Sequence, residues 1–597
     1  MNGQEEKLNK HPGTFLRLLK YAVPYVWHLT LGLFLMLGVI ALDLYRPILI
    51  GSAVDIFAEN GDTSLLTGIS VKYLICIVAI FLLNAASALI IGYTGQSIIY
   101  NLRMEVFKHV QSLSLRFFDI TPVGKIVTRV TNDVESLNEM FTNVIINLIK
   151  NTVKIIGLAI VMLTLDRKLA LLGFMLLPVV MVLTYFFRKI AHTTYRIVRT
   201  KLTALNTYLS EHLSGMRVIQ AFAKEEIKNA EFNDRATDLY HASFREMMVF
   251  AIFRPLMYIL SVLALITILG TGGLDVRAGG ITVGTLYVFT SYIQSFFEPI
   301  QELAEQFGTL QQSMASAEKV FTLLDDNTKI KAPETPEHIK NFRGRIEFSH
   351  VWFAYSGEDW ILKDVSFVIE PGTSAAFVGA TGAGKSSILN LIGRYYDIQR
   401  GSITIDGVDI KSINIDELRH YIGQVQQDVF LFTGDIKSNI SLKTEGISDE
   451  AVRNAAKNVN AERFISRLEH GYDEAVTERG ATFSAGERQL ISFARTLAHN
   501  PSILVLDEAT ANIDTETEGL IQDALSTLMK GRTTIMVAHR LSTIRHADKI
   551  MVMDDGQLKE QGTHEELITI PDGIYKKLYE LQLEDNEGTE PGLCGTV

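Results

Sequence analysis

The sequence predicts a membrane all-α domain with six spanning helices and long cytoplasmic helical extensions, followed by an α/β domain. Three observations predict this fold class. Six apolar stretches lie in the first 300 residues, and helical periodicity continues far beyond them, through about 96–138 and 188–246. From about residue 344 to residue 585, apolar strands alternate with helical stretches, which is typical of an α/β domain with a mainly parallel sheet.

The apolar stretches set the number of crossings, because a spanning helix needs roughly 20 apolar residues. They lie at residues 26–50, 71–95, 139–165, 168–187, 247–274 and 281–300. Residues 1–20 are polar and basic, and no small-residue cleavage site follows the first apolar run. We therefore expect an uncleaved first helix rather than a signal peptide.

The charges of the connecting segments predict the orientation in the membrane. The first connection, GSAVDIFAENGDTSLLTGIS, has acidic residues and no Lys or Arg, whereas the long segments on the other side are rich in both. Positively charged connections stay in the cytoplasm. Both termini and the α/β domain are therefore expected there.

The composition excludes several classes of protein. Hydrophobic residues make up 47% of the 597 residues and charged residues 21%, which fits a membrane part joined to a soluble part. A formal net charge of −11 argues against a nucleic-acid-binding surface. The two cysteines, Cys76 and Cys594, predict neither a disulfide framework nor a metal cluster.

The stretch GATGAGKS, Gly379 to Ser386, has the form G-x-x-x-x-G-K-S and lies between an apolar strand and a helical pattern. Glycines let the backbone aim N–H groups at phosphate oxygens, and the following helix adds its positive end. Lys385 can reach the β- and γ-phosphates, and the Ser386 hydroxyl can bind Mg²⁺. The expected nucleotide contacts here are Gly379, Ala380, Thr381, Gly382, Ala383, Gly384, Lys385, Ser386 and Ser387. A glycine turn that caps an ordinary helix is the alternative.

A second apolar strand, PSILVLDE, ends in Asp507 and Glu508. Hydrolysis of a nucleoside triphosphate needs one carboxylate directed toward Mg²⁺ and another toward the attacking water. We assign the metal role to Asp507 and the catalytic role to Glu508. A structural pair of acids at a strand end is the alternative.

Three further segments carry a family resemblance: FSAGERQLISFARTLAHNP between these motifs, and ANID and TTIMVAHRLST beyond them. Together the motifs resemble the nucleotide-binding domain of an ATP-binding-cassette (ABC) transporter, a P-loop ATPase. The resemblance implies that Tyr355 stacks on adenine and that Gln427 links Mg²⁺ to the membrane domain. It makes His539 the switch histidine near the γ-phosphate. The implied catalytic set is Glu508, His539, Lys385 and Gln427, and the implied metal set is Ser386, Gln427 and Asp507.

The resemblance also implies that each site forms between two nucleotide-binding domains, so a dimer is required. The signature motif would run from Ser484 to Arg488, with Ser484 and Gly486 as nucleotide contacts, and Asp514 would close the D-loop. The usual signature is LSGGQ, whereas this chain has FSAGE. A methyl group at Ala485 and a negative charge at Glu487 should weaken the site that this signature completes.

An intact catalytic set beside an altered signature resembles the active subunit of bacterial heterodimeric multidrug exporters. This implies a non-identical second half-transporter as the partner. A homodimer that tolerates FSAGE is the alternative.

The resemblance further implies the division of the chain. Residues 1–325 form an exporter-type transmembrane domain, 326–343 a polar linker, 344–585 the nucleotide-binding domain and 586–597 a disordered tail. The turns around Asp119 to Lys125 and Leu213 to Phe222 resemble the two coupling helices of exporters, although simple surface turns would have a similar pattern. The sequence shows no internal repeat, so the resemblance implies a half-transporter with one membrane domain and one ATPase domain.

Two lysines at membrane depth bear on the cargo. Lys150 and Lys154 are four residues apart and so lie on one helical face. Charges there should face a wet cavity or an acid partner such as Glu298 or Glu302. They would then attract an anionic headgroup or drug, or else pair within the helix bundle.

The predicted function is ATP-driven export of amphipathic small molecules across a bacterial inner (cytoplasmic) membrane. ATP and Mg²⁺ are the expected cofactors, and the lipid bilayer, the amphipathic substrate and a second subunit the expected partners. A homodimeric lipid or peptide exporter is the nearest alternative, and an ATP-gated channel or sensor is an alternative of another class. A solute importer fits less well, because membrane and ATPase parts are fused.

Overall fold

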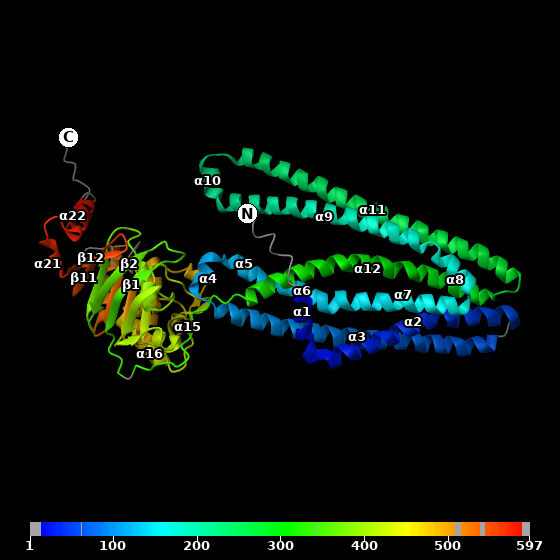
Figure 1. The fold of residues 1–597 in the computed structure, drawn as a ribbon, viewed down its shortest axis with the longest axis horizontal. Helices are drawn as coiled ribbons and strands as arrows, with labels where there is room; N and C mark the ends of the chain where they lie inside the picture. The colour runs from blue at the N-terminus through cyan, green and yellow to red at the C-terminus, as the bar shows by residue number, and fades with distance from the viewer. Residues whose placement is uncertain (1–12, 61–62, 340, 508–514, 538–543, 588–597) are drawn as a thin grey trace. The chain divides into compact units, whose positions relative to one another are not determined.

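The computed structural model describes residues 13–60, 63–339, 341–507, 515–537 and 544–587 (Figure 1). The chain divides into two compact units. The first comprises the residues up to 112 together with 122–326, and the second comprises 113–121 together with the residues from 327 onward. A short segment from the first third of the sequence thus belongs to the second unit.

In its described residues, the first unit is helical and contains no β-strand. Its α-helices are α1 (Thr14–Ala22), α2 (Val26–Asn60), α3 (Thr63–Gln111), α5 (Val123–Thr128), α6 (Val134–Glu139), α7 (Ile145–Leu165), α8 (Arg167–Phe174), α9 (Leu177–Ser214), α10 (Met216–Ala221), α11 (Glu225–Arg277) and α12 (Val283–Leu324). A 3₁₀ turn, η2 (Val23–Tyr25), joins α1 to α2, and two π-helical turns, η3 (Arg129–Asp133) and η4 (Met140–Val144), flank α6.

Among the residues that the structure describes, five helical stretches are long and apolar enough to cross a membrane. They are Thr14–Ala58, Leu66–Gln111, Val123–Leu165, Arg167–Ser214 and Glu225–Arg277. Each contains one of the first five expected spans. The sixth expected span, residues 281–300, lies in α12, which is not among these five stretches, since polar residues and Glu298 interrupt its apolar run. The predicted count of six is therefore only partly confirmed.

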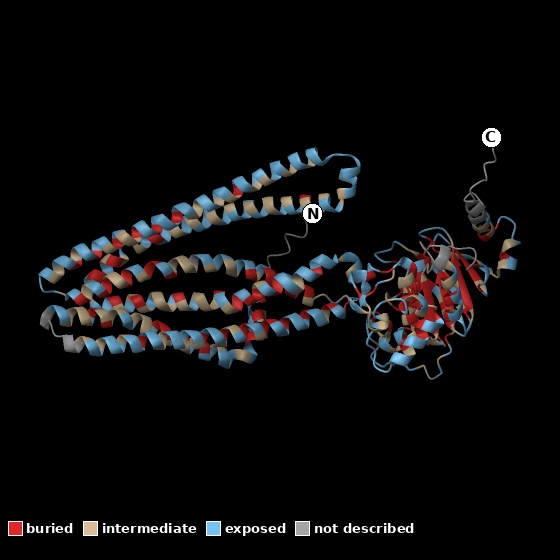
Figure 2. Ribbon diagram, turned by 180° about the vertical axis from the view of Figure 1, so that it is seen from behind, coloured by how far each residue is buried: buried red, intermediate tan, exposed pale blue. Residues whose placement is uncertain are grey.

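The helices of the first unit bury apolar side chains against one another and leave others exposed (Figure 2). One core joins α7, α8, α9, α11 and α12, and its fully buried side chains include Met162, Met257 and Phe289. Outside such contacts, large apolar side chains such as Trp27 and Phe81 are 78% and 70% exposed. Exposed apolar side chains on long helices are what a lipid environment accommodates.

In its described residues, the second unit contains three β-sheets. Its strands are β1 (Ile346–Phe353), β2 (Leu362–Ile369), β3 (Ser374–Val378), β4 (Arg400–Ile405), β5 (Val408–Asp409), β6 (Ile422–Val425), β7 (Gly434–Asp435), β8 (Ala475–Val476), β9 (Ile503–Asp507), β10 (Thr533–Val537), β11 (Lys549–Asp554) and β12 (Gln557–Gly562). The largest sheet has the order β12-β11-β3-β10-β9-β6, a second has the order β2-β1-β4-β5, and β7 pairs with β8.

The helices of this unit are α4 (Leu115–Ile120), α13 (Lys385–Ile392), α14 (Ile415–His420), α15 (Ile436–Ser441), α16 (Asp449–Asn458), α17 (Glu462–Ile465), α18 (Ala485–Ala498), α19 (Thr515–Met529), α21 (His564–Ile568) and α22 (Ile574–Glu587). Side chains of β3 alternate between two apolar cores. Ala375 and Phe377 pack in the core that includes residues of α13, and Ala376 and Val378 in the core that includes residues of α18. Strand β3 is therefore buried on both faces, as a central strand of a parallel sheet should be.

The expected linker between α12 and β1 makes specific contacts with the second unit. The backbone N–H of Glu337 donates to the carbonyl of Ser412 at 2.9 Å, and His338 Nδ1 lies 2.7 Å from the Glu417 carboxylate. At the other end of the chain, α22 continues to Glu587. It thus includes the first two residues of the expected tail, and the rest of that tail lies outside the described residues.

Candidate nucleotide-binding site

The loop Gly379–Gly384 joins β3 to α13, and two of its glycines have no room for a side chain. The φ angles of Gly379 and Gly384 are +149° and +97°. A Cβ atom on Gly379 would lie 2.1 Å from the carbonyl oxygen of Met553, and one on Gly384 would lie 2.7 Å from a methyl group of Leu362. Only glycine fits this path, which brings the backbone to the N-terminus of α13.

Lys385 begins α13 and is folded back over the loop. Its ammonium group donates to the carbonyl oxygens of Gly379 at 2.6 Å and Ala380 at 3.0 Å, and the residue is only 6% exposed. Thr381, Gly382 and Ser386 are exposed, while Ala383 and Ser387 are buried. A glycine cradle, one ammonium group and an accessible hydroxyl at a helix N-terminus form a donor set that fits a triphosphate with Mg²⁺.

The other expected site residues follow parallel strands of the same sheet. Strand β10 pairs with β3 and β9, and β6 pairs with β9, all in parallel. Asp507, the last residue of β9, lies opposite Val537, and exposed Gln427 comes two residues after β6. Because carboxyl ends of parallel strands share one edge, the loop, Asp507 and Gln427 lie along that edge.

Glu508, Asp514 and His539 lie outside the described residues. The strands that lead to two of them are described. Glu508 directly follows β9, and His539 comes two residues after β10.

Tyr355, the expected adenine-stacking residue, lies just beyond the end of β1. Its ring makes edge-to-face contacts with Phe353 and Tyr396, at centroid distances of 4.8 and 5.0 Å. Its hydroxyl lies 3.1 Å from the hydroxyl of Ser387, in the first turn of α13. The ring is thus held beside the helix that follows the phosphate loop, and the residue is 37% exposed.

The signature segment forms the N-terminus of α18. Ser484 is its N-cap: the Ser484 hydroxyl accepts from the Glu487 N–H at 3.2 Å, and the Glu487 carboxylate accepts from the Ser484 N–H at 2.8 Å. Gly486 is buried. This capping box places the Glu487 carboxylate at the positive end of the helix. The S-x-x-E pattern of residues 484–487 is typical of such a cap, but the sequence-based prediction for Glu487 considered only its negative charge.

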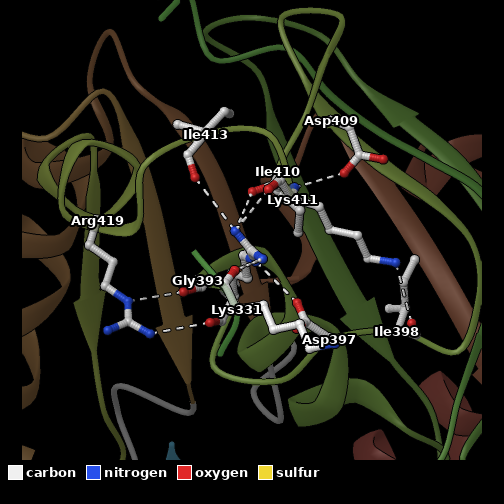
Figure 3. Close-up of polar contacts among 10 residues, drawn as sticks. Lys331, Gly393, Asp397, Ile398, Asp409, Ile410, Lys411, Ile413 and Arg419 are labelled. Carbon is white, nitrogen blue, oxygen red and sulfur yellow. Dashed lines mark hydrogen bonds and ion pairs between the residues drawn. The ribbon is translucent and has the colours of Figure 1, made fainter. Parts of the chain in front are cut away.

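Arg394, which was not predicted from the sequence, anchors the far end of the phosphate-loop helix. Its partners Lys331, Asp397, Ile410, Lys411 and Ile413 are labelled in Figure 3. It is 2% exposed, and one guanidinium nitrogen donates to the carbonyls of Ile410 and Lys411 at 3.1 and 3.2 Å. The group also donates to Lys331 O at 2.9 Å and pairs with Asp397 at 3.1 Å. A buried arginine with such partners fixes the chain after α13, and the only sequence signal was a lone Arg after an apolar helix.

The first expected coupling segment makes contacts within the second unit. The N–H of Ser114, the N-cap of α4, donates to Thr328 O at 2.8 Å, and the Tyr396 hydroxyl donates to the Asp119 carboxylate. Burial, followed by that hydrogen bond, raises the pKa of Tyr396, so its hydroxyl stays protonated and donates at neutral pH. The second expected coupling segment contains α10, which belongs to the first unit.

Lys150 and Lys154, which are expected at membrane depth, lie on α7. Lys154 Nζ lies 3.9 Å from the Glu298 carboxylate, and the neighbouring Asn151 amide donates to Glu302 at 2.7 Å. The expected acid partner is thus present for Lys154. For Lys150, the structure shows no ion pair with a described residue.

Comparisons with known proteins place both units in one family. A family model described as the ABC transporter transmembrane region matches residues 29–300, and one described as ABC transporter matches residues 362–511. The ABC transporter ATP-binding protein exp8 of Streptococcus pneumoniae is 40% identical over 95% of this chain and 97% of its own length. YheH of Bacillus subtilis, named as a multidrug resistance ABC transporter, is 39% identical over 82% of this chain and 73% of its own.

Two further comparisons extend over nearly the whole chain. The ATP-dependent lipid A-core flippase of Syntrophus aciditrophicus is 34% identical over 98% of this chain and 97% of its own. The structure of a bacterial Atm1-family ABC exporter with ATP bound matches with a TM-score of 0.78 and 27% identity, over 93% of this chain and 98% of that one. The chain therefore belongs to the ABC transporter family, as a half-transporter of the exporter type that couples ATP hydrolysis to transport.

Proposed function

We propose that the chain is the catalytically intact half of a heterodimeric exporter of amphipathic small molecules in a bacterial cytoplasmic membrane, with ATP and Mg²⁺ as cofactors. The observation that carries the proposal is the contrast between two helix ends. The loop before α13 has the glycines, ammonium group and hydroxyl that a nucleotide needs. The positive end of α18 already bears the chain's own Glu487 carboxylate.

The residues of the site would divide the work as follows. The loop N–H groups, Lys385 and the start of α13 would hold the phosphates, and Tyr355 would take the adenine ring. Ser386, Gln427 and Asp507 would hold Mg²⁺, which supplies charge neutralisation at the phosphates when bound. Glu508 would polarise the attacking water, and His539 would stabilise charge at the transferring phosphate.

ABC exporters act as dimers, and the signature of one subunit completes the nucleotide site of the other. The Glu487 carboxylate sits where the α18 N-terminus would receive a partner's nucleotide, and it uses the Ser484 N–H. A negative charge there repels phosphate and compensates the positive end of the helix dipole, which would otherwise attract phosphate. Two copies of this chain would therefore form two weak sites, whereas a partner with an ordinary signature would form a strong site on this chain.

Restoring the usual residues of the signature motif tests whether the partner subunit is a different protein. The double variant Ala485→Gly, Glu487→Gln keeps a capping-box side chain but removes the methyl group and the charge. We expect ATPase activity of the chain purified alone to be low and to rise about tenfold or more in this variant. Glu450→Gln, an exposed first-turn acid of α16, is the matched control and should leave activity unchanged. Rapid turnover by the unaltered chain alone would instead show a homodimer that tolerates FSAGE.

Transport itself is tested in inside-out vesicles that contain the chain with or without its partner subunit. We expect ATP-dependent accumulation of a fluorescent amphipathic dye, which a nonhydrolysable ATP analogue does not support. Dye movement down its gradient with the analogue would indicate an ATP-gated channel and contradict the proposal. A lipid exporter is the second candidate, since a relative 34% identical over 98% of the chain is named as a lipid A-core flippase.

A further inference from the structure

A cavity of about 900 Å³ opens in the first unit between α9, α11 and α12. Four arginines line it: Arg188, Arg196 and Arg199 come from α9 and Arg254 from α11. Two acids, Glu246 and Glu305, also line it, and His192 adds a positive charge when protonated. With neutral histidine, the charged lining residues leave a net charge of +2. We call this space the basic cavity.

The arginines of the basic cavity are not neutralised by its acids. The structure shows no ion pair between the arginines and Glu246 or Glu305. Arg188 stacks on the Phe307 ring at 3.9 Å, and Arg199 donates to the Tyr195 hydroxyl at 2.8 Å. Arg196 and Arg254 have no hydrogen bond or ion pair to any side chain that the structure describes. Two guanidinium groups thus keep their fork of donors available.

Aromatic rings supply an apolar wall beside these charges. Phe187 stacks on Phe253 at 3.7 Å and meets Phe250 edge-on at 5.3 Å. Phe187, Phe250 and Tyr195 line the same cavity as the arginines. A ligand in this space would therefore meet planar cations and ring faces together, which suits a molecule with a negative group and an apolar body.

The four arginines of the basic cavity are exposed and lie at different distances along their helices. At a rise of about 1.5 Å per residue, Arg188 lies about 17 Å along α9 from its first residue, Leu177, and Arg199 about 33 Å. The hydrocarbon core of a bilayer is about 30 Å thick. The expected fourth span ends at residue 187, so Arg188, Arg196 and Arg199 follow it on the cytoplasmic side, whereas Arg254 lies within the expected fifth span, residues 247–274. The cavity therefore lies at the cytoplasmic boundary of the expected spans. An arginine is costly at membrane depth unless it faces water or a partner.

A positive charge that sets the orientation of a protein in the membrane needs only to lie in the cytoplasm. It does not need to line a cavity together with other charges. Here, side chains from two helices converge on one space with aromatic neighbours. Of the two lysines on α7, Lys154 lies within ion-pair distance of Glu298. The arginines, which converge on one cavity, are the groups best placed for an external anion.

We propose that the basic cavity binds an amphipathic anion, that is, a carboxylate, phosphate or sulfonate attached to an apolar body. This inference rests on the proposed export function and names its substrate class. Arg196 and Arg254 bind the acidic group, and the rings of Phe187 and Phe250 contact the apolar body. Two sources share this chemistry: an anionic lipid of the inner leaflet and a soluble organic anion of the cytoplasm.

The first arm of the test measures binding of a matched probe series to the full chain in phosphatidylcholine nanodiscs. The probes are pyrenebutanoate, pyrenebutanol and pyrenebutylamine, which share an apolar body and differ in charge. We expect the anion to bind about tenfold or more tightly than the other two. In Arg196→Gln, Arg254→Gln that preference disappears, while Arg196→Lys, Arg254→Lys retains part of it.

The matched control removes one exposed charge from each of the same two helices, outside the cavity. Lys189→Gln, Arg245→Gln should bind pyrenebutanoate as the native chain does. Equal losses in the cavity variant and the control, or equal binding of the three probes by the native chain, overturn the proposal. ATPase activity, measured in parallel with the partner subunit, separates the two proposals: activity without anion preference leaves the exporter function standing and removes the basic cavity.

The second arm distinguishes the sources. The protein is extracted from membranes of mixed phosphatidylglycerol and phosphatidylcholine, and the lipid that co-purifies is measured by mass spectrometry. If phosphatidylglycerol co-purifies with the native chain and with the control, but not with the Arg196→Gln, Arg254→Gln variant, the ligand of the cavity is a lipid headgroup. Pyrenebutanoate binding without such retention assigns it to a soluble anion. If the chain neither retains phosphatidylglycerol nor binds pyrenebutanoate, the proposal is contradicted.

Discussion

The Glu508→Gln variant is expected to bind ATP as tightly as the native chain and to lose about 100-fold or more of its ATPase activity. Gln has nearly the shape of Glu but cannot accept a proton from the attacking water, and a general base contributes about 10²-fold to 10⁴-fold to rate. Nucleotide binding depends on the loop before α13 and should be unaffected. Both quantities are measured in nanodiscs with the partner subunit present, by calorimetric titration and by phosphate release.

Glu469→Gln is the control for this substitution, because Glu469 is an exposed acid of the same unit and no hydrogen bond or ion pair to a described residue involves its side chain. Its activity should equal that of the native protein. Near-native ATPase activity in Glu508→Gln would remove Glu508 from the role of general base. Loss of ATP binding as well as turnover would show damage to the site rather than to its chemistry.

Gly379→Ala should weaken ATP binding by about 100-fold or more and lower the melting temperature of the protein. The new Cβ would lie 2.1 Å from the Met553 carbonyl oxygen, far inside van der Waals contact, at a residue with φ of +149°. Because the obstacle is backbone of β11, relief requires movement of the loop away from β11. That movement would disturb the N–H groups that hold phosphate.

The variant Gly382→Ala, in the same loop, tests whether the steric clash or the strain of a positive φ angle causes the loss of ATP binding. Gly382 has φ of +87°, but nothing lies within 4 Å of the position a Cβ would take. A left-handed conformation costs an alanine about 1–2 kcal/mol, so we expect a loss of ATP affinity of about tenfold. Equal effects of the two substitutions would show that strain alone governs the loop. Titration with ATP and thermal melting of both variants distinguish these outcomes.

The sequence was most informative where a short motif determines local geometry. A G-x-x-x-x-G-K-S run after an apolar strand predicted a glycine loop followed by a helix, and the structure shows both, with the helix beginning at Lys385. It was less informative where partners are distant in sequence. The carbonyl partners of Arg394 come from residue 331 and residues 410–413, and no spacing rule links them.

The basic cavity was missed for the same reason. In the sequence, the segments rich in Lys and Arg indicate only which connections stay in the cytoplasm. The common space of Arg188, Arg196 and Arg199 with Arg254 depends on the packing of three helices. The sixth span was predicted from apolar content alone, without weighing the polar residues and Glu298 of α12. The position of residues 113–121 in the second unit depends on contacts such as that of Asp119 with Tyr396, more than 270 residues apart.

The strand order of the large sheet has a consequence for how the protein is made. Strand β3 carries the phosphate loop, yet its neighbour β10 is among the last strands to be synthesised, and β11, on its other side, comes later still. A ribosome that has passed Ser386 has produced the loop without either neighbour of its strand. The nascent nucleotide-binding domain must therefore wait until residue 554 leaves the exit tunnel before β3 is paired on both sides. The transmembrane helices, all synthesised earlier, enter the membrane before that sheet can close.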